Sequence, residues 1–207
     1  MLKLLGKSSS INVRKVLWTC AEIGLAYDQE EWGSGHRNTD DDAFRALNPN
    51  VMVPVIIDGD LVLWESNTIC RYLAMQHGRA NLLPADAVGR ARVEQWMDWQ
   101  ATELNNAWRY AFMALVRRSS EHTDPAATAT SVRNWNRHMT LLDEQLARTG
   151  AYAAGSSFTL ADVVLGLSLN RWLMTPMERP VLTNVAAYHA RLNARPGFLA
   201  HGNNGTP

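Results

Sequence analysis

Strand-forming sequence is confined to the first third of this 207-residue chain, and this asymmetry constrains the fold more than any other feature. Up to about residue 78, short apolar runs alternate with segments whose apolar residues fall at helical spacing, in the order β-α-β-α-β-β-α. That order predicts a small mixed sheet with helices packed on it. Beyond residue 86 the strand signals almost vanish, which predicts an all-helical second domain.

The expected elements can be assigned to residue ranges. We expect strands at 2–5, 27–32, 53–57 and 61–64, the last two forming a hairpin, and helices at 12–23, 42–47, 67–77, 88–118, 125–148, 159–173 and 181–194. Ser66 is expected to cap the third helix, and the polar tail from residue 202 is expected to be mobile. The chain therefore divides into a first domain at 1–78, a linker at 79–86 and a helical domain at 87–207.

Composition excludes several classes of protein. The formal net charge is zero, so no charge excess indicates a nucleic-acid or membrane partner. No apolar run is long enough for a transmembrane helix or a signal peptide, so a cytoplasmic protein is expected. Cys20 and Cys70 lie far apart without a CxxC motif, which predicts two buried free thiols and neither a disulfide nor a metal site.

The segment from Ser8 to Lys15 joins the first strand to the first helix and offers donors for an anion. Backbone N–H groups at a helix start lack intrahelical partners and carry positive potential. Donor side chains placed there, Ser9, Ser10 and Asn12, can hydrogen-bond a thiolate and lower the pKa of a thiol. A capped helix with spare serines is the alternative interpretation of the same residues.

Two later segments complement this helix start. A cis bond between Val53 and Pro54 would leave the N–H and C=O of Val53 free to pair with an extended peptide, whereas a trans bond would merely open an edge strand. Glu65 can bind an ammonium group, and Ser66 with the following helix-start amides can bind a carboxylate. Together Glu65 and Ser66 match the head group of an α-amino acid, although helix capping alone also explains them.

In combination these segments resemble the glutathione transferase superfamily. The matching residues are Ser10 before the first helix, Asn48-Pro49 followed by Val53-Pro54, Glu65-Ser66 with Ile69, Tyr72 and Leu73 after it, and Phe158-Thr159-Leu160-Ala161-Asp162. The resemblance covers nearly the whole chain. It implies an α/β N-terminal thioredoxin-like domain plus an all-α C-terminal helical bundle, and a detoxifying homodimer that uses glutathione and no metal.

The resemblance also implies a role for individual residues. Val53 would pair with the glutathione backbone, and Glu65 and Ser66 would hold the γ-glutamyl head. Ser10 would be the principal thiolate donor, with Asn12 or Ser9 as alternatives. The glycine end of glutathione needs a cation or amide donors, for which His36 and Arg37 are candidates, although a solvated loop also explains their charges. Thr159 and Asp162 would form a capping box that serves folding. The chain departs from the family at Val51, where glycine is frequent, and at Asn67, where a small apolar residue is frequent.

The helical domain would hold the electrophile. The far end of its long helix supplies Trp108, Arg109, Phe112 and Met113, and such side chains form an adaptable apolar pocket, although core packing also explains the pattern. The expected function is a glutathione transferase that activates glutathione as a thiolate for attack on a small electrophile. A glutathione-dependent disulfide or peroxide reductase, favoured if Asn12 is the main activator, a glutathione-dependent isomerase and a non-catalytic interaction module are the alternatives.

Overall fold

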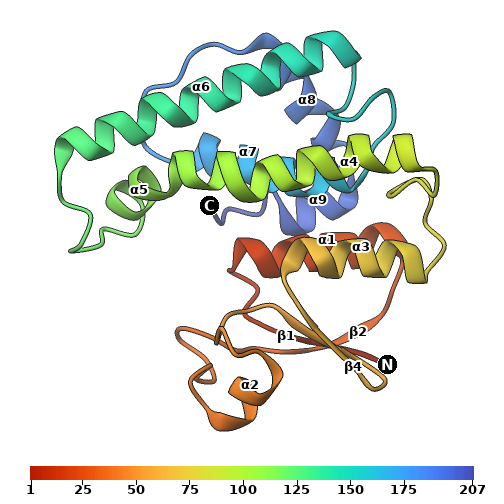
Figure 1. Ribbon diagram of the computed structural model, residues 1–207. Coiled ribbons are helices and arrows are strands. Elements are labelled where there is room, and N and C mark those ends of the chain that lie inside the picture. The colour runs from red at the N-terminus through yellow and green to blue at the C-terminus, as the bar shows by residue number, and fades with distance from the viewer.

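The computed structural model describes residues 1–207 as a sheet-containing half stacked against a larger helical half (Figure 1). The strands are β1 (Leu2–Leu5), β2 (Tyr27–Glu30), β3 (Val55–Asp58) and β4 (Leu61–Trp64), in the spatial order β2-β1-β3-β4. β1 runs parallel to β2 and antiparallel to β3, and β3 and β4 form the predicted hairpin. The predicted mixed sheet is confirmed.

Neighbouring residues on β1 point to opposite faces of the sheet, and each face is covered by different helices. Leu4 belongs to the main core with residues of α1 (Ile11–Ile23) and α3 (Ser66–Gln76). Leu5 packs with Phe44 of the short helix α2 (Asp42–Leu47) on the other face. In Figure 1, α1 and α3 lie between the sheet and the helical half.

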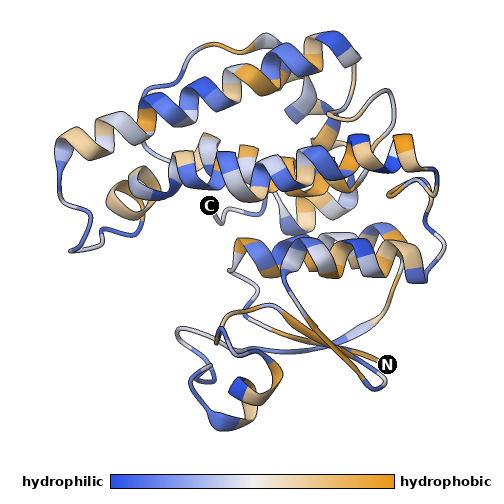
Figure 2. Ribbon diagram, in the orientation of Figure 1, coloured by the Kyte–Doolittle hydropathy of each residue, from blue (hydrophilic) through white to orange (hydrophobic).

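The helical half begins with three consecutive helical segments, α4 (Ala87–Trp99), the π-helical η1 (Gln100–Leu104) and α5 (Asn105–Leu115). It continues with α6 (Pro125–Thr149), α7 (Leu160–Met174), α8 (Thr183–Asn193) and α9 (Pro196–His201). α7 is the central helix, because 13 of its 15 residues are buried, and it is apolar on nearly all sides. Figure 2 shows that α4 and α6 instead alternate hydrophobic and hydrophilic residues, as expected of helices with one exposed face.

The two halves share one hydrophobic core. Trp18 of α1 is fully buried, and its ring centroid lies 5.7 Å from that of Phe158 and 5.1 Å from that of Phe198 in the helical half. Gly197 permits this approach, because a Cβ there would lie 2.5 Å from Trp18 Cδ1. Burial of aromatic surface therefore fixes α1 against the helical half.

Three local predictions were wrong. The helix expected at 88–118 contains the π-helical η1, because apolar spacing alone does not reveal a turn with one extra residue. Ser66 is the first residue of α3, and Glu65 takes the cap position with a φ of 71°. The tail is anchored, because the Arg14 guanidinium donates to the Thr206 carbonyl oxygen at 2.7 Å and to an oxygen of Pro207 at 2.8 Å.

Two further expectations about local structure are met, at the start of α7 and at the cysteines. The capping box at the start of α7 is confirmed, with the Thr159 N–H donating to Asp162 Oδ2 at 2.8 Å. Cys20 and Cys70 are both buried and unpaired. Residues 77–86, between α3 and α4, contain neither helix nor strand. None of the helices combines the length and apolar content needed to cross a membrane.

Candidate functional site

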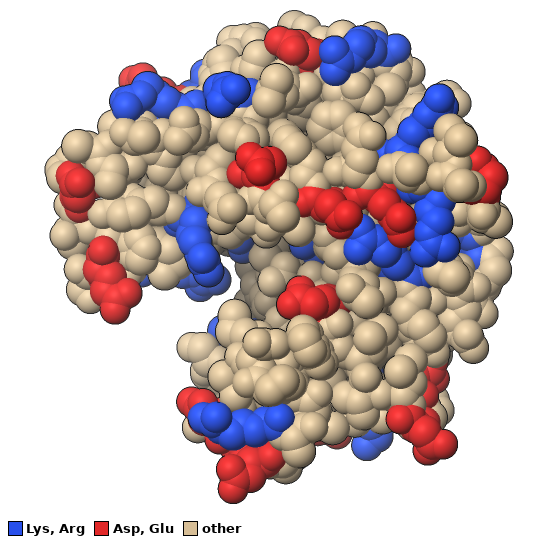
Figure 3. All heavy atoms as spheres, in the orientation of Figure 1, with Lys and Arg blue, Asp and Glu red and all other residues tan.

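Two cavities meet at the start of α1, and Asn12 lines both of them. We call the cavity that Val53 and Glu65 line the sheet-side pocket, and the cavity that Trp108 and Arg109 line the interdomain pocket. Figure 3 shows the molecule hollowed between its two halves. Ser10 is the cap residue of α1, and its carbonyl accepts the first helical hydrogen bond, from the Arg14 N–H at 2.9 Å. The N–H groups of residues 11–13 precede that bond, so they are donors without helical partners at the positive end of the helix.

The sheet-side pocket presents free backbone groups. It has a volume of about 140 Å³ and is lined by Asn12, Asn48, Asn50, Met52, Val53, Pro54, Glu65 and Ser66. The Val53–Pro54 peptide bond is cis. Neither the N–H nor the C=O of Val53 is hydrogen-bonded to the rest of the protein, so both are available to an extended peptide.

Asn48 shapes the loop that presents Val53. Its side chain is buried at the end of α2, where Nδ2 donates to the Met52 carbonyl at 2.8 Å and Oδ1 accepts from the Asn50 N–H at 3.0 Å. Gly6 lets this loop approach the start of α1, because a Cβ at residue 6 would lie 3.1 Å from Val53 Cβ. The geometry of the pocket therefore depends on an asparagine and a glycine outside the expected site residues.

Glu65 and Ser66 lie at the end of the same pocket, where α3 begins. The φ of Glu65 is 71°, a conformation that costs a non-glycine residue about 1–3 kcal/mol and that clusters at functional sites. Its carboxylate is exposed and forms no salt bridge. Ser66 is buried, and the first helical bond of α3 runs from the Ile69 N–H to the Glu65 carbonyl, which leaves the amides of 66–68 unpaired within the helix. A free carboxylate beside an anion-binding helix start suits a zwitterionic amino-acid head group.

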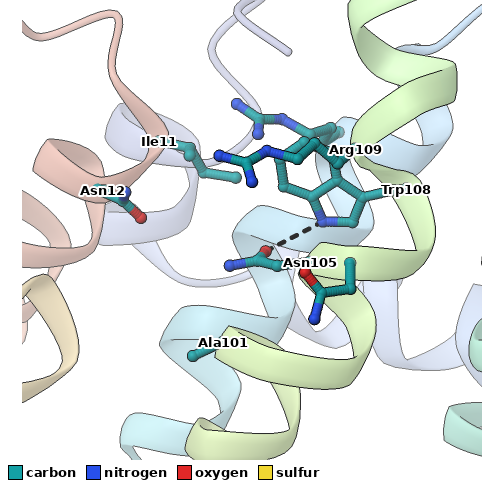
Figure 4. A pocket seen from close by; sticks show the side chains of 8 residues that line it. Ile11, Asn12, Ala101, Asn105, Trp108 and Arg109 are labelled. Atoms are coloured by element: carbon teal, nitrogen blue, oxygen red, sulfur yellow. Dashed lines mark hydrogen bonds between the residues drawn. The ribbon is translucent and has the colours of Figure 1, made fainter.

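The interdomain pocket has a volume of about 270 Å³ and is lined by Ile11, Asn12, Ala101, Asn105, Asn106, Trp108, Arg109 and Arg171. In Figure 4 the side chain of Arg109 extends from α5 toward Ile11 and Asn12 on α1. Trp108 Nε1 donates to Asn105 Oδ1 at 3.1 Å, which fixes the indole as one wall of the pocket (Figure 4).

Arg171 of α7 places a buried cation on that wall. The residue is only 4% exposed, and its guanidinium carbon lies 4.5 Å from the Trp108 ring centroid and 4.1 Å from that of Phe112. Burial, followed by the charges of Arg14 and Arg117, lowers the pKa of Arg171 to about 9. The pocket is therefore more polar and more cationic than the aromatic pattern of the long helix indicates.

The structure brings together most, though not all, of the residues expected at the site. Val53, Glu65 and Ser66 line the sheet-side pocket together with Asn12. Trp108 and Arg109 line the interdomain pocket, whereas Met113 lines neither cavity and Phe112 is buried beneath the Arg171 guanidinium. Ser10 lines neither cavity.

The two candidates for the glycine end lie away from both cavities. Arg37 Nη1 donates to Glu30 Oε2 at 2.7 Å, and its guanidinium carbon lies 5.4 Å from the Trp32 ring centroid. His36 Nε2 lies 3.6 Å from Glu31 Oε2. Neither side chain lines the sheet-side pocket, whose loop side is formed by Asn48, Asn50 and Met52. No three His, Cys, Asp or Glu side chains lie close enough together to hold a metal ion.

Several lining residues were not predicted as site residues, although three of them carried a signal in the sequence. Asn48-Pro49-Asn50 is a turn signature directly before the cis proline. Arg171 is the lone cation within the mostly apolar helix α7. Asn105 and Asn106 carried no comparable signal, because their place in the pocket depends on the π-helical η1 that precedes them.

Comparison with known proteins agrees with this geometry along most of the chain. The profile described as "Glutathione S-transferase, N-terminal domain" matches residues 4–81, and that described as "Glutathione S-transferase, C-terminal domain" matches residues 105–196. Among curated relatives, "Glutathione S-transferase GstB" of Escherichia coli (strain K12) is 38% identical, and the alignment covers 89% of this chain and 97% of the relative. "Glutathione S-transferase 3" of Zea mays is 34% identical, spanning 95% of this chain and 91% of the relative.

A solved structure agrees equally well. The theta class glutathione S-transferase from Xanthomonas axonopodis pv. citri, determined with glutathione bound, superimposes with a TM-score of 0.90 at 38% identity. The match covers 97% of this chain and 96% of that one. Sequence profiles, curated relatives and fold therefore agree, and the chain belongs to the glutathione S-transferase family.

Proposed function

We propose that this chain is a glutathione transferase that activates the thiol of glutathione at the start of α1 for attack on a small electrophile. The observation that carries the proposal is that Asn12 lines two cavities of different character. The sheet-side pocket offers a free backbone pair and an amino-acid head site, and the interdomain pocket offers an aromatic and polar wall. A tripeptide in the first cavity would present its cysteine to the second, so proximity would supply much of the rate enhancement.

Each part of glutathione has a complementary group in the sheet-side pocket. The γ-glutamyl ammonium would pair with Glu65, and its carboxylate with Ser66 and the amides at the start of α3. The cysteinyl backbone would pair with the N–H and C=O of Val53. Asn50, which lines the same pocket, would reach the glycine end in place of Arg37.

Asn12 is the favoured thiolate donor in this proposal, with Ser10 as the alternative. Asn12 has an amide donor and lines both cavities, whereas Ser10 lines neither. Lowering the thiol pKa by one unit requires about 1.4 kcal/mol. One hydrogen bond to a charged group contributes about 1.5–3 kcal/mol, so the amide and the unpaired N–H groups of α1 suffice.

The test is a pH titration of the thiolate absorbance of bound glutathione in the wild type, Asn12→Ala and Ser10→Ala. We expect the wild type to ionise the thiol well below its ordinary pKa of about 8.5. We expect Asn12→Ala to raise that pKa by about one unit and Ser10→Ala to raise it less. A thiol that titrates as in water, or glutathione that does not bind to the wild type, would overturn the proposal.

A glutathione-dependent disulfide reductase is the second candidate, and the position of Asn12 favours it. An amide donor stabilises a thiolate leaving group as well as an attacking thiolate, so the same site suits thiol–disulfide exchange. Turnover of an aryl halide and of a small disulfide by the same preparation separates the two functions. A disulfide kcat/KM well above that for the aryl halide would assign the chain to the reductase.

Three broader expectations belong to the same proposal. The residues that would bind glutathione lie within 1–78, and most of those that would bind the electrophile lie within 87–207, which supports a division at the 79–86 segment. A homodimer and a role in detoxification follow from family membership and stay predictions, as does a cytoplasmic location. Sedimentation of the purified chain tests the oligomeric state.

A further inference from the structure

Arg171 is a buried cation on the wall of the interdomain pocket, and no acidic side chain pairs with it. Its Nε atom is buried without a hydrogen-bond acceptor in the protein. The one acceptor of its terminal nitrogens is an oxygen of Pro207, the last residue of the sequence, at the long distance of 3.5 Å from Nη2. Buried charges are normally paired or coordinated, because an uncompensated charge in a low-dielectric site is costly. An anionic ligand in the pocket would supply the hydrogen-bond acceptors that Arg171 lacks in the protein.

The side chains around Arg171 add positive charge and no negative charge. None of the eight residues lining the pocket is acidic, and Arg109 is a second guanidinium among them. Arg14 and Arg117 lie near enough to lower the pKa of Arg171. No salt bridge joins any of these four arginines to an acidic side chain. In Figure 3 basic atoms lie on the upper edge of the hollow between the two halves.

Arg14 shows how a neighbouring buried arginine is compensated. Its Nη1 donates to the Thr206 carbonyl oxygen at 2.7 Å and lies 3.3 Å from Asn204 Oδ1, and its Nη2 donates to an oxygen of Pro207 at 2.8 Å. The Nε atoms of both arginines are buried without an acceptor, but the tail satisfies the terminal nitrogens of Arg14, whereas those of Arg171 receive only the distant Pro207 contact. The remaining donors of Arg171 are free for a ligand of the pocket.

We propose that the electrophile taken by this chain carries a carboxylate, which Arg171 and Arg109 bind on the wall facing Asn12. The inference rests on the proposed transferase function and names the substrate class of that site. Stacking on Trp108 and Phe112 holds the Arg171 guanidinium, and its planar fork suits two parallel hydrogen bonds to a carboxylate. A volume of about 270 Å³ restricts the substrate to a compact molecule, such as one aromatic ring bearing a leaving group.

The reaction is a substitution at carbon. The glutathione thiol loses its proton to solvent, and the thiolate sulfur forms a bond to the ring carbon that bears the halide. The carbon–halogen bond then breaks and the halide leaves with its electron pair, so no oxidant or reductant is needed. The carboxylate takes no part in bond making, and its role is to hold the electrophilic carbon beside the sulfur.

The test uses a matched pair of electrophiles, 4-fluoro-3-nitrobenzoate and its neutral analogue 4-fluoro-3-nitrobenzamide. For each, kcat/KM is divided by the second-order rate constant of the uncatalysed reaction with glutathione, which removes the difference in intrinsic reactivity. We expect the wild type to favour the carboxylate by about tenfold or more, since each charge-assisted hydrogen bond contributes on that scale. The preference should decline as salt screens the exposed Arg109.

Two substitutions and one control locate the effect. Arg109→Gln, at an exposed position, and Arg171→Lys, which keeps the charge and loses the planar fork, should each reduce the preference several-fold. Arg137→Gln removes the same charge from the exposed face of α6 outside the pocket and should leave the preference unchanged. A wild type that binds glutathione and conjugates the amide with no preference for the carboxylate overturns this inference alone. A wild type that fails to bind glutathione overturns the proposed function as well.

Discussion

Lys15 Nζ, on α1, donates a hydrogen bond of 2.9 Å to Gln100 Oε1, on the π-helical η1 of the other half. Lys15 is 2% exposed, and its second acceptor is Asn67 Oδ1 at 3.1 Å. Gln100 Nε2 in turn donates to Asn105 Oδ1 and Ser168 Oγ, each at 3.0 Å. A chain of hydrogen bonds therefore joins the helix that would activate the thiol to Asn105, which lines the interdomain pocket.

The Lys15→Met variant tests this network through its pH dependence. Burial lowers the pKa of Lys15 from 10.5 to about 8, so between those values the folded chain holds fewer protons here than the unfolded chain. The contribution of Lys15 to stability therefore increases with pH above about 8. We expect the free energy of unfolding of the wild type, relative to Lys15→Met, to increase by roughly 1 kcal/mol between pH 8 and pH 9. Urea unfolding at the two pH values measures the difference.

Lys3→Met is the matched control for Lys15→Met. Lys3 is half-exposed on β1 and pairs only with Glu30, so the control removes one charge without opening the interface. The stability difference between wild type and Lys3→Met should stay constant from pH 8 to pH 9. A Lys15→Met curve that runs parallel to that of Lys3→Met would show that the ammonium is not shifted by burial.

Asn67 shows why part of this network could not be predicted. In the sequence it is a departure from the family, and nothing local explains an amide in the first turn of a packed helix. In the structure its Oδ1 accepts from Lys15 and its Nδ2 donates to the Met97 carbonyl at 2.9 Å. Both partners are distant in sequence, so only the packed fold reveals that the amide satisfies a buried cation.

Arg37→Gln should leave glutathione binding almost unchanged. Arg37 is held by Glu30 and by the face of Trp32, and its guanidinium does not line the sheet-side pocket. We expect a change in the dissociation constant for glutathione of less than about twofold, since an exposed ion pair contributes only ~0–1 kcal/mol. Asn50→Ala, which alters a residue of the pocket, should weaken binding several-fold. Calorimetric titration with glutathione measures both dissociation constants. A large loss of affinity in Arg37→Gln alone would show that Arg37 does bind glutathione.

Val51→Gly should stabilise the protein. Val51 has a φ of 52°, in the left-handed region, which costs a residue with a Cβ roughly 1–2 kcal/mol. Glycine removes this strain but loses about 0.5–1 kcal/mol through the greater freedom of the unfolded chain. The expected net gain is about 0.5–1 kcal/mol in the free energy of unfolding, measured with urea. Val62→Gly, on the regular strand β4, should instead lower stability, and equal losses in both variants would contradict the argument.

The elements and their order could be predicted because apolar spacing directly reflects which face of each helix or strand is buried. The strands β1 and β4, the helix α2 and the capping box of α7 lie where the sequence places them.

The cavities could be predicted only in part. Asn12, Val53 and Glu65 converge as expected, but the electrophile side was predicted to be apolar because Arg171 lies 62 positions after Arg109, and sequence spacing does not bring the two together. The composition of that wall of the interdomain pocket depends on long-range packing and on the π-helical turn η1.

Asp162, which completes the capping box of α7, is also a buried titratable group. Its carboxylate accepts hydrogen bonds from the N–H groups of Thr159 at 2.8 Å and Ala153 at 2.9 Å, and from the Tyr188 hydroxyl at 2.9 Å. Burial nevertheless raises its pKa from 3.8 to about 6. Between these values the folded chain holds more protons here than the unfolded chain, so the contribution of Asp162 to stability declines as pH increases from about 4 to 6.

Asp162→Asn cannot titrate, and its amide nitrogen cannot accept the bond that it replaces, so we expect a destabilisation of about 1–3 kcal/mol at neutral pH. The destabilisation should be larger at pH 4 than at pH 7, by up to about 3 kcal/mol. Asp28→Asn, at an exposed position on β2, controls for the loss of one carboxylate. Urea unfolding of the three proteins across this range measures the effect, and an Asp162→Asn deficit that grows with pH would contradict the burial of this carboxylate.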